Sequence, residues 1–571
     1  MHFRISLLVV VPALLLFCAG CRTAERTMIG ISRIQSPILL VTPEINKPFS
    51  QDDLSQARID YKTLKPTPLP PPPATNSSKA RYDSYSDLMD KPVTVVVCLS
   101  GGGARAARMA AFTMASLERR YNSNFTSTAR SHPLAAQIDG WSSVSGGSVY
   151  ASFVAAQLRL DAGARTNTFE DLITSGWVKL GTRQLGGVAA FSYLWGYAPV
   201  MQLTSDWDTL HLFAHNLAVL QNRNPFVIPA PNACKLGDLP ERPRFFFNAV
   251  CRETGRPFVF TQSVIHRDIS GDPLARLDLN EDPISLWITN SPVETTNQQQ
   301  ELFNHAATLE DLGSPPSRFP LVYAVLASAA FPGVFEPLTL QRFSFDTNAE
   351  PVHVKHRMAP WRRNKVTIVD GGIYDNTGVV SALSLLDYLE KGMKKNGGKM
   401  VILSVDANKD RTGYQGPSGA SYIPCKLDLP FRGLVPAVET MRNFFRCQQA
   451  LIQIAIQHRV LQLQKAGILN YYAVRLCDAT NVMVPSSDLV KNISKTEGNL
   501  EDTTLAQLEN IDMFGLIKNI PTDFVLKAGE DEKLRRTVES LLDQVSPDSK
   551  KTVAQGFLES LKPLAVPTKE R

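Results

Sequence analysis

A serine in the stretch IDGWSSVSGGSVYASF, residues 138–153, has the surroundings of a nucleophile. An apolar, strand-like run ends at Val144, and an apolar helix is expected from about Gly146. A nucleophilic serine needs its hydroxyl exposed at a sharp turn between strand and helix, and small neighbours let the backbone bend that tightly. The letters SVSGG match the pattern GxSxG, except that Ser143 stands in the first glycine position. We therefore predict that Ser145 is a catalytic nucleophile; an ordinary Ser/Gly turn is the alternative.

Donors for a developing negative charge are expected in two places. A helix that begins at Gly146 would direct the positive end of its dipole, and the Gly146 N–H, toward an ester bound at Ser145. The letters SGGGAR place three glycines after an apolar strand at 93–100 and before an alanine-rich helix, so their N–H groups can converge on one anion. The predicted oxyanion hole therefore consists of Gly146 with the loop residues Gly101, Gly102 and Gly103.

The same glycine loop also fits GxGxxA, a dinucleotide-binding fingerprint. That fingerprint requires an acidic residue about 20 positions further on, at the end of the next strand. Here the acidic residue at that distance, Glu118, falls inside the expected helix. A dinucleotide-binding oxidoreductase that uses Gly101–Gly103 is the alternative enzyme class, and it would leave Ser145 without a role.

A carboxylate is the expected proton acceptor, because no histidine of the chain lies in a recognisable strand-end context. The letters VDGGIYDN place Asp370 at the end of an apolar strand, 366–369, and directly before Gly371 and Gly372. Nucleophile elbows and anion-binding turns lie at the carboxyl edge of a parallel sheet, and we expect Asp370 to emerge at that edge as the general base. A plain Asp-Gly-Gly turn is the alternative.

Three elements thus follow one another along the chain: the glycine loop with Arg105 behind it, the Ser145 elbow, and the Asp-Gly-Gly that begins at Asp370. In this order they resemble the patatin-like phospholipase family, and the resemblance covers about 93–407. The letters FNAVCRETGRPFVF and AVLASAAFPGVFEP add local matches. The resemblance implies a lipid acyl hydrolase with a Ser-Asp dyad, Ser145 as nucleophile and Asp370 as general base, without cofactor or metal. It also implies that Arg105 either orders the loop or contacts substrate phosphate.

The wider pattern predicts an α/β fold. Apolar, β-branched or aromatic runs alternate with helical stretches, which indicates a mainly parallel sheet. The resemblance specifies this as a three-layer α/β/α fold with a mainly parallel central sheet and a small C-terminal helical region. One expected strand ends at Val144, and the others lie at 93–100, 244–250, 256–262, 366–369 and 399–407.

A long helical stretch is also expected at 439–464. Phe444, Leu451, Ile454 and Leu461 recur in it at helical spacing, which indicates a face that packs in the core. Docking of this face on a membrane or a partner is the alternative.

The two ends of the chain differ from its middle. Residues 1–21 contain Arg4, an apolar run too short to cross a bilayer, and small residues before Cys21, as in a secretory signal peptide. They resemble a bacterial lipoprotein signal, which implies a lipid on Cys21 and a lipid-anchored place in the bacterial cell envelope; a short membrane anchor is the alternative. The expected domains are a signal peptide at 1–21, a proline-rich tether at 22–91, a hydrolase domain at 92–480 with an aromatic insertion at about 160–240, and a helical appendage at 481–571.

Composition narrows the partners. The 60 basic and 54 acidic residues are spread along the chain, so no basic block is available to follow a nucleic acid. The cysteines beyond Cys21 show neither a disulfide framework nor paired metal-ligand spacing. We expect a lipid ester at a membrane surface, phospholipid or lysophospholipid, as substrate; no protein partner can be named. A catalytically degenerate envelope lipoprotein that acts as a binding module is the second alternative.

Overall fold

The computed structural model of this 571-residue chain describes residues 82–83, 85–125, 132–160, 165–174, 178, 234–252, 254–265, 306–331, 337–341, 365–408, 436–481, 528–545 and 550–561. The expected signal peptide with Cys21, most of the tether and most of the aromatic insertion lie outside the described residues.

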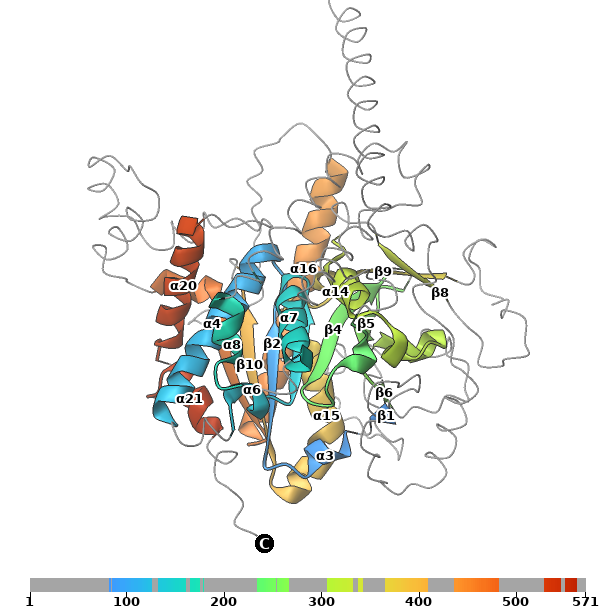
Figure 1. Cartoon of the computed structure of the whole chain (residues 1–571). Coiled ribbons are helices and arrows are strands. Elements are labelled where there is room, and N and C mark those ends of the chain that lie inside the picture. The colour runs from blue at the N-terminus through green and yellow to red at the C-terminus, as the bar shows by residue number, and fades with distance from the viewer. Residues whose placement is uncertain are drawn as a thin grey trace, which may run out of the picture.

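A large sheet forms the middle layer of the molecule (Figure 1). Within the described residues it has nine strands, in the order β11-β10-β2-β3-β4-β5-β7, with β9 paired to β4 and β8 paired to β9. Neighbours from β11 to β4 are parallel, whereas β5 and β9 run antiparallel to β4. A separate pair consists of β1 (Tyr82–Asp83) and β6 (Val264–Ile265). The sheet strands are β2 (Val93–Leu99), β3 (Gly140–Val144), β4 (Arg244–Cys251), β5 (Pro257–Phe260), β7 (Ala307–Thr308), β8 (Leu338–Gln341), β9 (Lys365–Asp370), β10 (Lys399–Asp406) and β11 (Leu469–Arg475).

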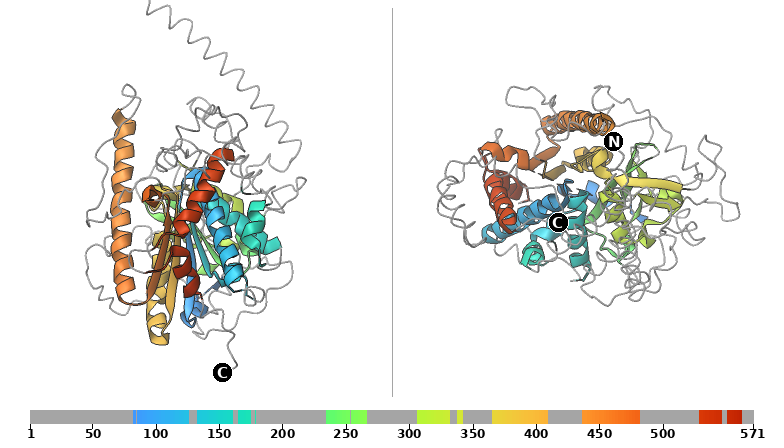
Figure 2. Two further views of the ribbon diagram at one scale, coloured as in Figure 1. Left: turned by 90° about the vertical axis from the view of Figure 1, so that its left-hand side faces the viewer. Right: turned by 90° about the horizontal axis from the view of Figure 1, so that it is seen from above.

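Helices cover both faces of this sheet, as Figures 1 and 2 show. One face carries α4 (Gly103–Asn124), α7 (Gly146–Leu160), α8 (Thr168–Thr174), α14 (Leu321–Ala329), α20 (Ala528–Leu542) and α21 (Val553–Ser560). The other carries α15 (Val379–Asn396) and α16 (Pro436–Lys465), with the short α3 (Ser86–Met89) beside α15. A further short helix, α6 (Leu134–Gln137), precedes β3. The predicted three-layer α/β/α fold with a mainly parallel central sheet is confirmed.

The apolar runs form strands because both of their faces are covered. In β2, Val95 and Val97 join the core under α4 and α7, whereas Val96 and Cys98 join the core under α15 and α16. Alternate residues of a strand point to opposite faces, so a strand between two helical layers needs apolar side chains at every position. This explains the unbroken apolar run from Val95 to Leu99.

The C-terminal helices α20 and α21 belong to the packed body. Leu534 and Val538 of α20, with Phe557 of α21, join the same core cluster as α4. The segment beyond 481 was expected as an appendage, but its described helices share the core of the sheet's first helical layer. They cover α4, the helix that follows the glycine loop.

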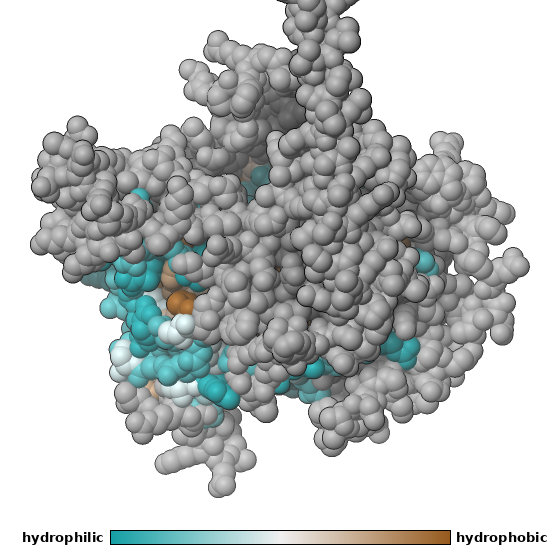
Figure 3. Space-filling view, turned by 45° about the horizontal axis from the view of Figure 1, so that its top comes forward, coloured by the Kyte–Doolittle hydropathy of each residue, from teal (hydrophilic) through white to brown (hydrophobic). Residues whose placement is uncertain are grey.

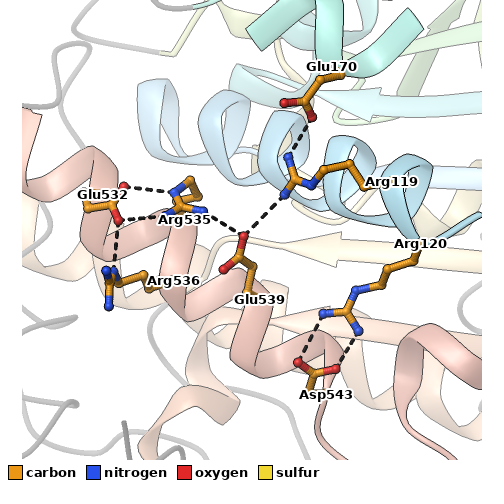
Figure 4. A network of polar contacts seen from close by, with 8 residues as sticks. All are labelled: Arg119, Arg120, Glu170, Glu532, Arg535, Arg536, Glu539 and Asp543. Carbon is orange, nitrogen blue, oxygen red and sulfur yellow. Dashed lines mark hydrogen bonds and ion pairs between the residues drawn. The ribbon is translucent and has the colours of Figure 1, made fainter. Parts of the chain in front are cut away.

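Charged side chains border this contact between α4 and α20 (Figure 4). Arg119 of α4 bridges Glu170 of α8 at 2.7 Å and Glu539 of α20 at 3.3 Å. Arg120 contacts both carboxylate oxygens of Asp543, at 2.5 and 3.1 Å. Figure 3 shows that the described surface on this side of the molecule is mostly hydrophilic. These exposed ion pairs each contribute roughly 0–1 kcal/mol, so the apolar core holds α20 in place.

The long helix α16 is present, but its buried face differs from the predicted one. Leu451 and Leu461 are 56% and 45% exposed, so the prediction that they lie on the core face is wrong. Ile452, Ile456 and Val460 pack toward α15 and the sheet instead. The helix carries two apolar stripes, and only one can face the sheet. Among the described helices, none has both the length and the apolar character to cross a membrane.

Candidate active site

Ser145 lies at a strained turn between β3 and α7. Its φ angle is 49°, in the left-handed region that residues with a Cβ rarely adopt. The turn lies directly against the glycine loop: a Cβ added at Gly146 would clash with the backbone of Gly103, and one at Gly147 would lie 2.7 Å from the Ser100 carbonyl oxygen. Only glycine fits at these two positions, which explains the pair that follows Ser145. The result is a half-exposed hydroxyl among buried neighbours.

Ser143, which replaces the first glycine of the GxSxG pattern, is fully buried in β3. Its hydroxyl accepts a hydrogen bond from Ser148 at 3.0 Å and lies 3.4 Å from the carbonyl oxygen of Phe246. A serine fits here because its polar atom has partners inside the protein. The departure from the pattern therefore leaves the turn intact.

Asp370 reaches Ser145 from the opposite direction. Strand β3 pairs with the first part of β4, up to Val144 opposite Asn248. Strand β9 pairs with the last part of β4, and Asp370 lies opposite Ala249, the next residue along. The C-terminal ends of β3 and β9 therefore meet on the same side of β4. Strand β9 runs antiparallel to β4 and does not pair with β3. It nevertheless brings the Asp370 carboxylate to the C-terminal end of β3.

The Ser145 side chain interacts with the Asp370 carboxyl group, and this interaction favours the ionised form of the carboxyl. The Gly372 amide donates a hydrogen bond to Asp370 Oδ1 at 2.7 Å. Burial raises the pKa of the Asp370 carboxyl from 3.8 to about 7, and the interactions with Gly372 and Ser145 oppose that rise. A carboxylate with this pKa is a stronger base than an exposed aspartate, and much of it is ionised at neutral pH.

The glycine loop presents part of the predicted oxyanion hole. The amide of the buried Gly101 already donates to the Asn376 carbonyl oxygen at 2.8 Å, so this predicted donor is occupied. Gly102 and Gly103 are partly exposed and have φ angles of 127° and 62°. Their amides, and that of Gly146, have no acceptor within the described residues. Three of the four predicted N–H groups can therefore still bind an anion near Ser145 Oγ.

The loop is held by the residue before it. The Ser100 amide donates to the Val405 carbonyl oxygen at 3.0 Å, and the Ser100 hydroxyl accepts from the Ala407 amide at 2.8 Å. The Ser100 carbonyl in turn accepts from the Gly147 amide at 3.1 Å. Ser100 thus joins the end of β10, the glycine loop and the elbow.

Two buried polar residues under the elbow have roles that the sequence alone did not reveal. Ser328 of α14 accepts from the Ser145 amide at 3.1 Å and donates to the Asn248 carbonyl oxygen at 2.6 Å. The Asn248 carboxamide bonds to Ser142, to the Ser143 carbonyl and to Ser381. Both lie in the stretches FNAV and LASAAF that carry the family resemblance. One signal for these roles was present in the sequence: Asn248 and Ser328 are each the single polar residue of an apolar run.

Arg105 and Glu118 lie behind the site. Arg105 is 4% exposed, and its guanidinium lies 3.6 Å from the point where a Cβ of Gly102 would be, which places it against the loop.

Glu118 accepts hydrogen bonds from the amides of Phe169 and Glu170, at 2.8 and 2.9 Å, at the beginning of α8. Burial raises the pKa of Glu118 to about 8. The acidic residue considered for dinucleotide binding is thus engaged in capping a helix.

Helix α16 contacts the Asp370 turn from the other face of the sheet. Gln449 donates a hydrogen bond to the Gly372 carbonyl oxygen, and Gln453 lies 3.5 Å from the Thr377 hydroxyl. The sequence offered no signal for this contact, because glutamines on a long amphipathic helix are usually solvated.

The fold and the site define an α/β protein in which a strained serine lies near a buried carboxylate, beside backbone amides that have no acceptor among the described residues. A family model, patatin-like phospholipase, matches residues 97–383, which is half of the chain and contains all of these groups. The chain belongs to the patatin-like phospholipase family. Membership indicates a lipid acyl hydrolase. No curated protein matches the chain in sequence.

Proposed function

We propose that this protein is a serine acyl hydrolase that releases fatty acid from phospholipid or lysophospholipid through a Ser145–Asp370 dyad. The observation that carries the proposal is the interaction of the strained Ser145 side chain with the buried Asp370 carboxyl group, where the C-terminal ends of β3 and β9 meet. The strained turn fixes the position of the hydroxyl before substrate binds, and the nearby carboxylate can accept its proton.

In the first half-reaction, Ser145 Oγ bonds to the ester carbonyl carbon while its proton passes to Asp370. The carbonyl π electrons move to the carbonyl oxygen, which becomes an oxyanion beside the amides of Gly102, Gly103 and Gly146. When the intermediate collapses, the bond to the alcohol breaks, and the alcohol leaves with the proton from Asp370. The fatty acyl group remains as an ester on Ser145.

In the second half-reaction, water takes the place of the alcohol. Asp370 accepts a proton from water as the water oxygen bonds to the acyl carbon. Collapse of this second intermediate releases the fatty acid and returns the proton to Ser145 Oγ. Each step uses Asp370 alternately as base and acid, for which a pKa of about 7 is suited.

Preorganised dipoles must supply much of the barrier lowering, because a carboxylate is a weaker base than the alkoxide it helps to generate. The N-terminal ends of α4 and α7 both lie at the site, since these helices begin at Gly103 and Gly146. A single oxyanion donor contributes roughly 2.7–4 kcal/mol in enzymes where it has been removed. Three free amides are therefore a substantial contribution.

The location of the enzyme is a further part of the proposal. A lipid on Cys21, followed by the proline-rich tether at 22–91, would anchor the protein to the bacterial envelope without a spanning helix. Such an anchor would keep the site close to its lipid substrate. Replacement of Cys21 by Ala should move the protein from the membrane fraction to the soluble fraction, and unchanged membrane association would contradict the anchor.

Incubation of the purified protein with a mixed lipid extract, followed by mass analysis of the products, tests the function. We expect free fatty acid and the matching lysophospholipid or glycerophospho compound from wild type, and none from Ser145→Ala. Ser123→Ala, at an exposed serine near the end of α4, is the control and should retain activity. Equal turnover in wild type and Ser145→Ala would refute the proposal.

A further inference from the structure

Asn376 lies between the two turns that carry the active site. It stands in the segment that joins Asp370 to α15, and its side-chain oxygen occupies the space beside two glycines of the site. A Cβ added at Gly101 would clash with Asn376 Oδ1 and would lie 3.3 Å from Ser145 Cβ. One added at Gly372 would lie 2.8 Å from the same oxygen and 3.0 Å from Asp370 Oδ1. The carboxamide is therefore adjacent to both members of the dyad.

The backbone of Asn376 occupies a donor that would otherwise serve the oxyanion. Its carbonyl oxygen accepts the Gly101 amide at 2.8 Å, which locks the glycine loop to the Asp370 turn. Of the four predicted donors, the amides of Gly102, Gly103 and Gly146 then remain without an acceptor among the described residues.

The Asn376 side chain is half-buried and makes no hydrogen bond to any described residue. Its neighbour Asp375 is different: that carboxylate accepts bonds from the Thr377 amide and hydroxyl, at 2.8 and 2.6 Å, and from the Val380 amide at 2.9 Å. Asp375 thus organises the turn and the beginning of α15. The hydrogen-bonding capacity of Asn376 is not needed for that purpose.

The Asn376 carboxamide is not among the fully buried polar groups that lack a partner within the described residues, so its atoms can reach water or a bound substrate. The carboxamide carries two N–H donors and one acceptor, and a rotation about its last bond exchanges their positions. The group nearest to Ser145 that needs a donor during catalysis is the substrate oxyanion.

We propose that the Asn376 carboxamide donates an N–H to the oxyanion, as a side-chain member of the oxyanion hole that takes the place of the occupied Gly101 amide. The proposal rests on the acyl hydrolase function given above. Side-chain amides serve this role in other serine hydrolases because the N–H is strongly polar and carries no net charge. Asn376 is then a catalytic residue, since it contacts the reacting oxygen.

Three roles for Asn376 predict different results. An oxyanion donor acts mainly in the transition state, so its loss lowers kcat and leaves KM nearly unchanged. A contact to the lipid head group acts in the ground state as well, so its loss raises KM. A purely structural role lowers the melting temperature, and activity falls with the folded fraction.

The test compares Asn376→Ala and Asn376→Asp with wild type on a phospholipid or lysophospholipid, with kcat, KM and melting temperature measured for each. Asn376→Asp keeps the shape of the side chain but removes both N–H donors. A long-chain alkyl trifluoromethyl ketone is the second probe, because it adds to the serine as a tetrahedral oxyanion and resembles the intermediate. The control is Asn396→Ala, which removes an exposed carboxamide at the far end of α15.

We expect both Asn376 variants to lose about 10²-fold in kcat and to bind the trifluoromethyl ketone weaker by a similar factor, with the melting temperature and KM close to wild type. Asn396→Ala should match wild type. A kcat within threefold of wild type, a rise in KM alone, or a parallel loss of activity and melting temperature would each overturn the proposal.

Ser145→Ala keeps this result separate from the function itself. If wild type hydrolyses the lipid and Ser145→Ala does not, the acyl hydrolase function stands whatever the Asn376 variants do. If wild type and Ser145→Ala turn over equally, the proposed function fails and the role of Asn376 fails with it.

Discussion

The matched half of the chain, 97–383, and the part outside it contribute differently to the active site. The matched half supplies the groups that react: the glycine loop, the Ser145 elbow and Asp370. The part outside supplies β10, β11, α16, α20 and α21. Strand β10 pairs with β2 on one side and β11 on the other, so a strand outside the match lies inside the sheet. The boundary of the family match is therefore not a boundary of folding.

Several contacts join residues of the matched half to residues outside it. Ser100, next to the glycine loop, bonds to Val405 and Ala407 at the end of β10. Gly372, two residues after Asp370, bonds to Gln449 of α16. Arg108 of α4 is held by Asp531 of α20. The part outside the match thus adds contacts that fix the position of catalytic groups in the matched half, and substitutions in the two parts should have different signatures.

Asp370→Asn should have the largest effect, because it removes the base from the matched half. General-base catalysis contributes roughly 10²–10⁴-fold, and kcat should fall by about that factor while the fold persists. Measurement of kcat with a soluble ester and circular dichroism of the same sample would test both points. Retention of more than a tenth of the wild-type kcat would contradict the role of Asp370.

The same variant should be more stable than wild type at high pH. The folded-state pKa of Asp370 is raised above 3.8 to about 7, so the folded protein holds this proton more tightly than the unfolded chain. The stabilising contribution of the protonated group is present below pH 3.8 and is lost as pH rises to about 7. Unfolding in urea should show Asp370→Asn gaining stability over wild type between pH 5 and pH 8, on the order of 2 kcal/mol. A gain that is independent of pH would argue against the raised pKa.

The pH dependence of wild-type activity sharpens the comparison. The ionised form of Asp370 is the base, so kcat/KM should rise through a midpoint near pH 7 and level off above it. Below the midpoint the loss should be about tenfold per pH unit, hence on the order of 10² at pH 5. Asp531→Asn, outside the match, should leave the midpoint where it is. A midpoint near pH 4 would contradict the raised pKa of Asp370. A midpoint that moves in Asp531→Asn would mean that the part outside the match also sets this pKa.

Two aspartates, Asp531 in α20 and Asp543 directly after it, test how the part outside the match supports α4. Asp531 bonds to Arg108 through both oxygens, at 2.8 and 2.7 Å, and the side chains are 13% and 6% exposed. Asp543 makes the corresponding contact with Arg120 but is 60% exposed. Asp531→Asn should lower the free energy of unfolding by about 3 kcal/mol, since it leaves a buried guanidinium unpaired. Asp543→Asn should cost less than about 1 kcal/mol.

Equal losses in these two variants, measured by urea unfolding at constant pH, would mean that burial of the Arg108 contact is unimportant. In that case the apolar contacts of α20 alone would attach the C-terminal helices to α4.

The smallest effect is expected at Gln449. Its amide contacts the Gly372 carbonyl, and the Gly372 amide contacts Asp370, so Gln449 positions the base without touching substrate. Gln449→Ala should lower kcat a few-fold and leave KM and the melting temperature nearly unchanged, in line with the loss of about 1 kcal/mol for one hydrogen bond. Gln464→Ala, at an exposed position of the same helix, is the matched control. If the two variants had identical activity, Gln449 of α16 would have no part in positioning Asp370.

Much of this site was predictable because its motifs are local. A strand, a small-residue turn and a helix are each encoded within a few residues, so Ser145, the glycine loop and Asp370 could be found in order along the chain. The fold class followed from the alternation of strands and helices. The family resemblance then joined three weak signals into one specific prediction.

Long-range pairing could not be predicted in the same way. Nothing near Asp370 indicates that β9 runs antiparallel to β4 and meets β3 head to head, because that depends on residues more than a hundred positions away. The occupied amide of Gly101 follows from the same arrangement, since its acceptor is Asn376. The choice between two apolar stripes on α16 likewise depends on what the sheet presents to it.

The most direct test of the central claim is reaction with an alkyl fluorophosphonate, followed by peptide mapping by mass spectrometry. The account predicts a single adduct on Ser145, none in Ser145→Ala, and a much slower reaction in Asp370→Asn, because only an activated serine displaces fluoride. A wild-type protein that stays unlabelled, or one labelled at another residue while Ser145 stays free, would contradict it.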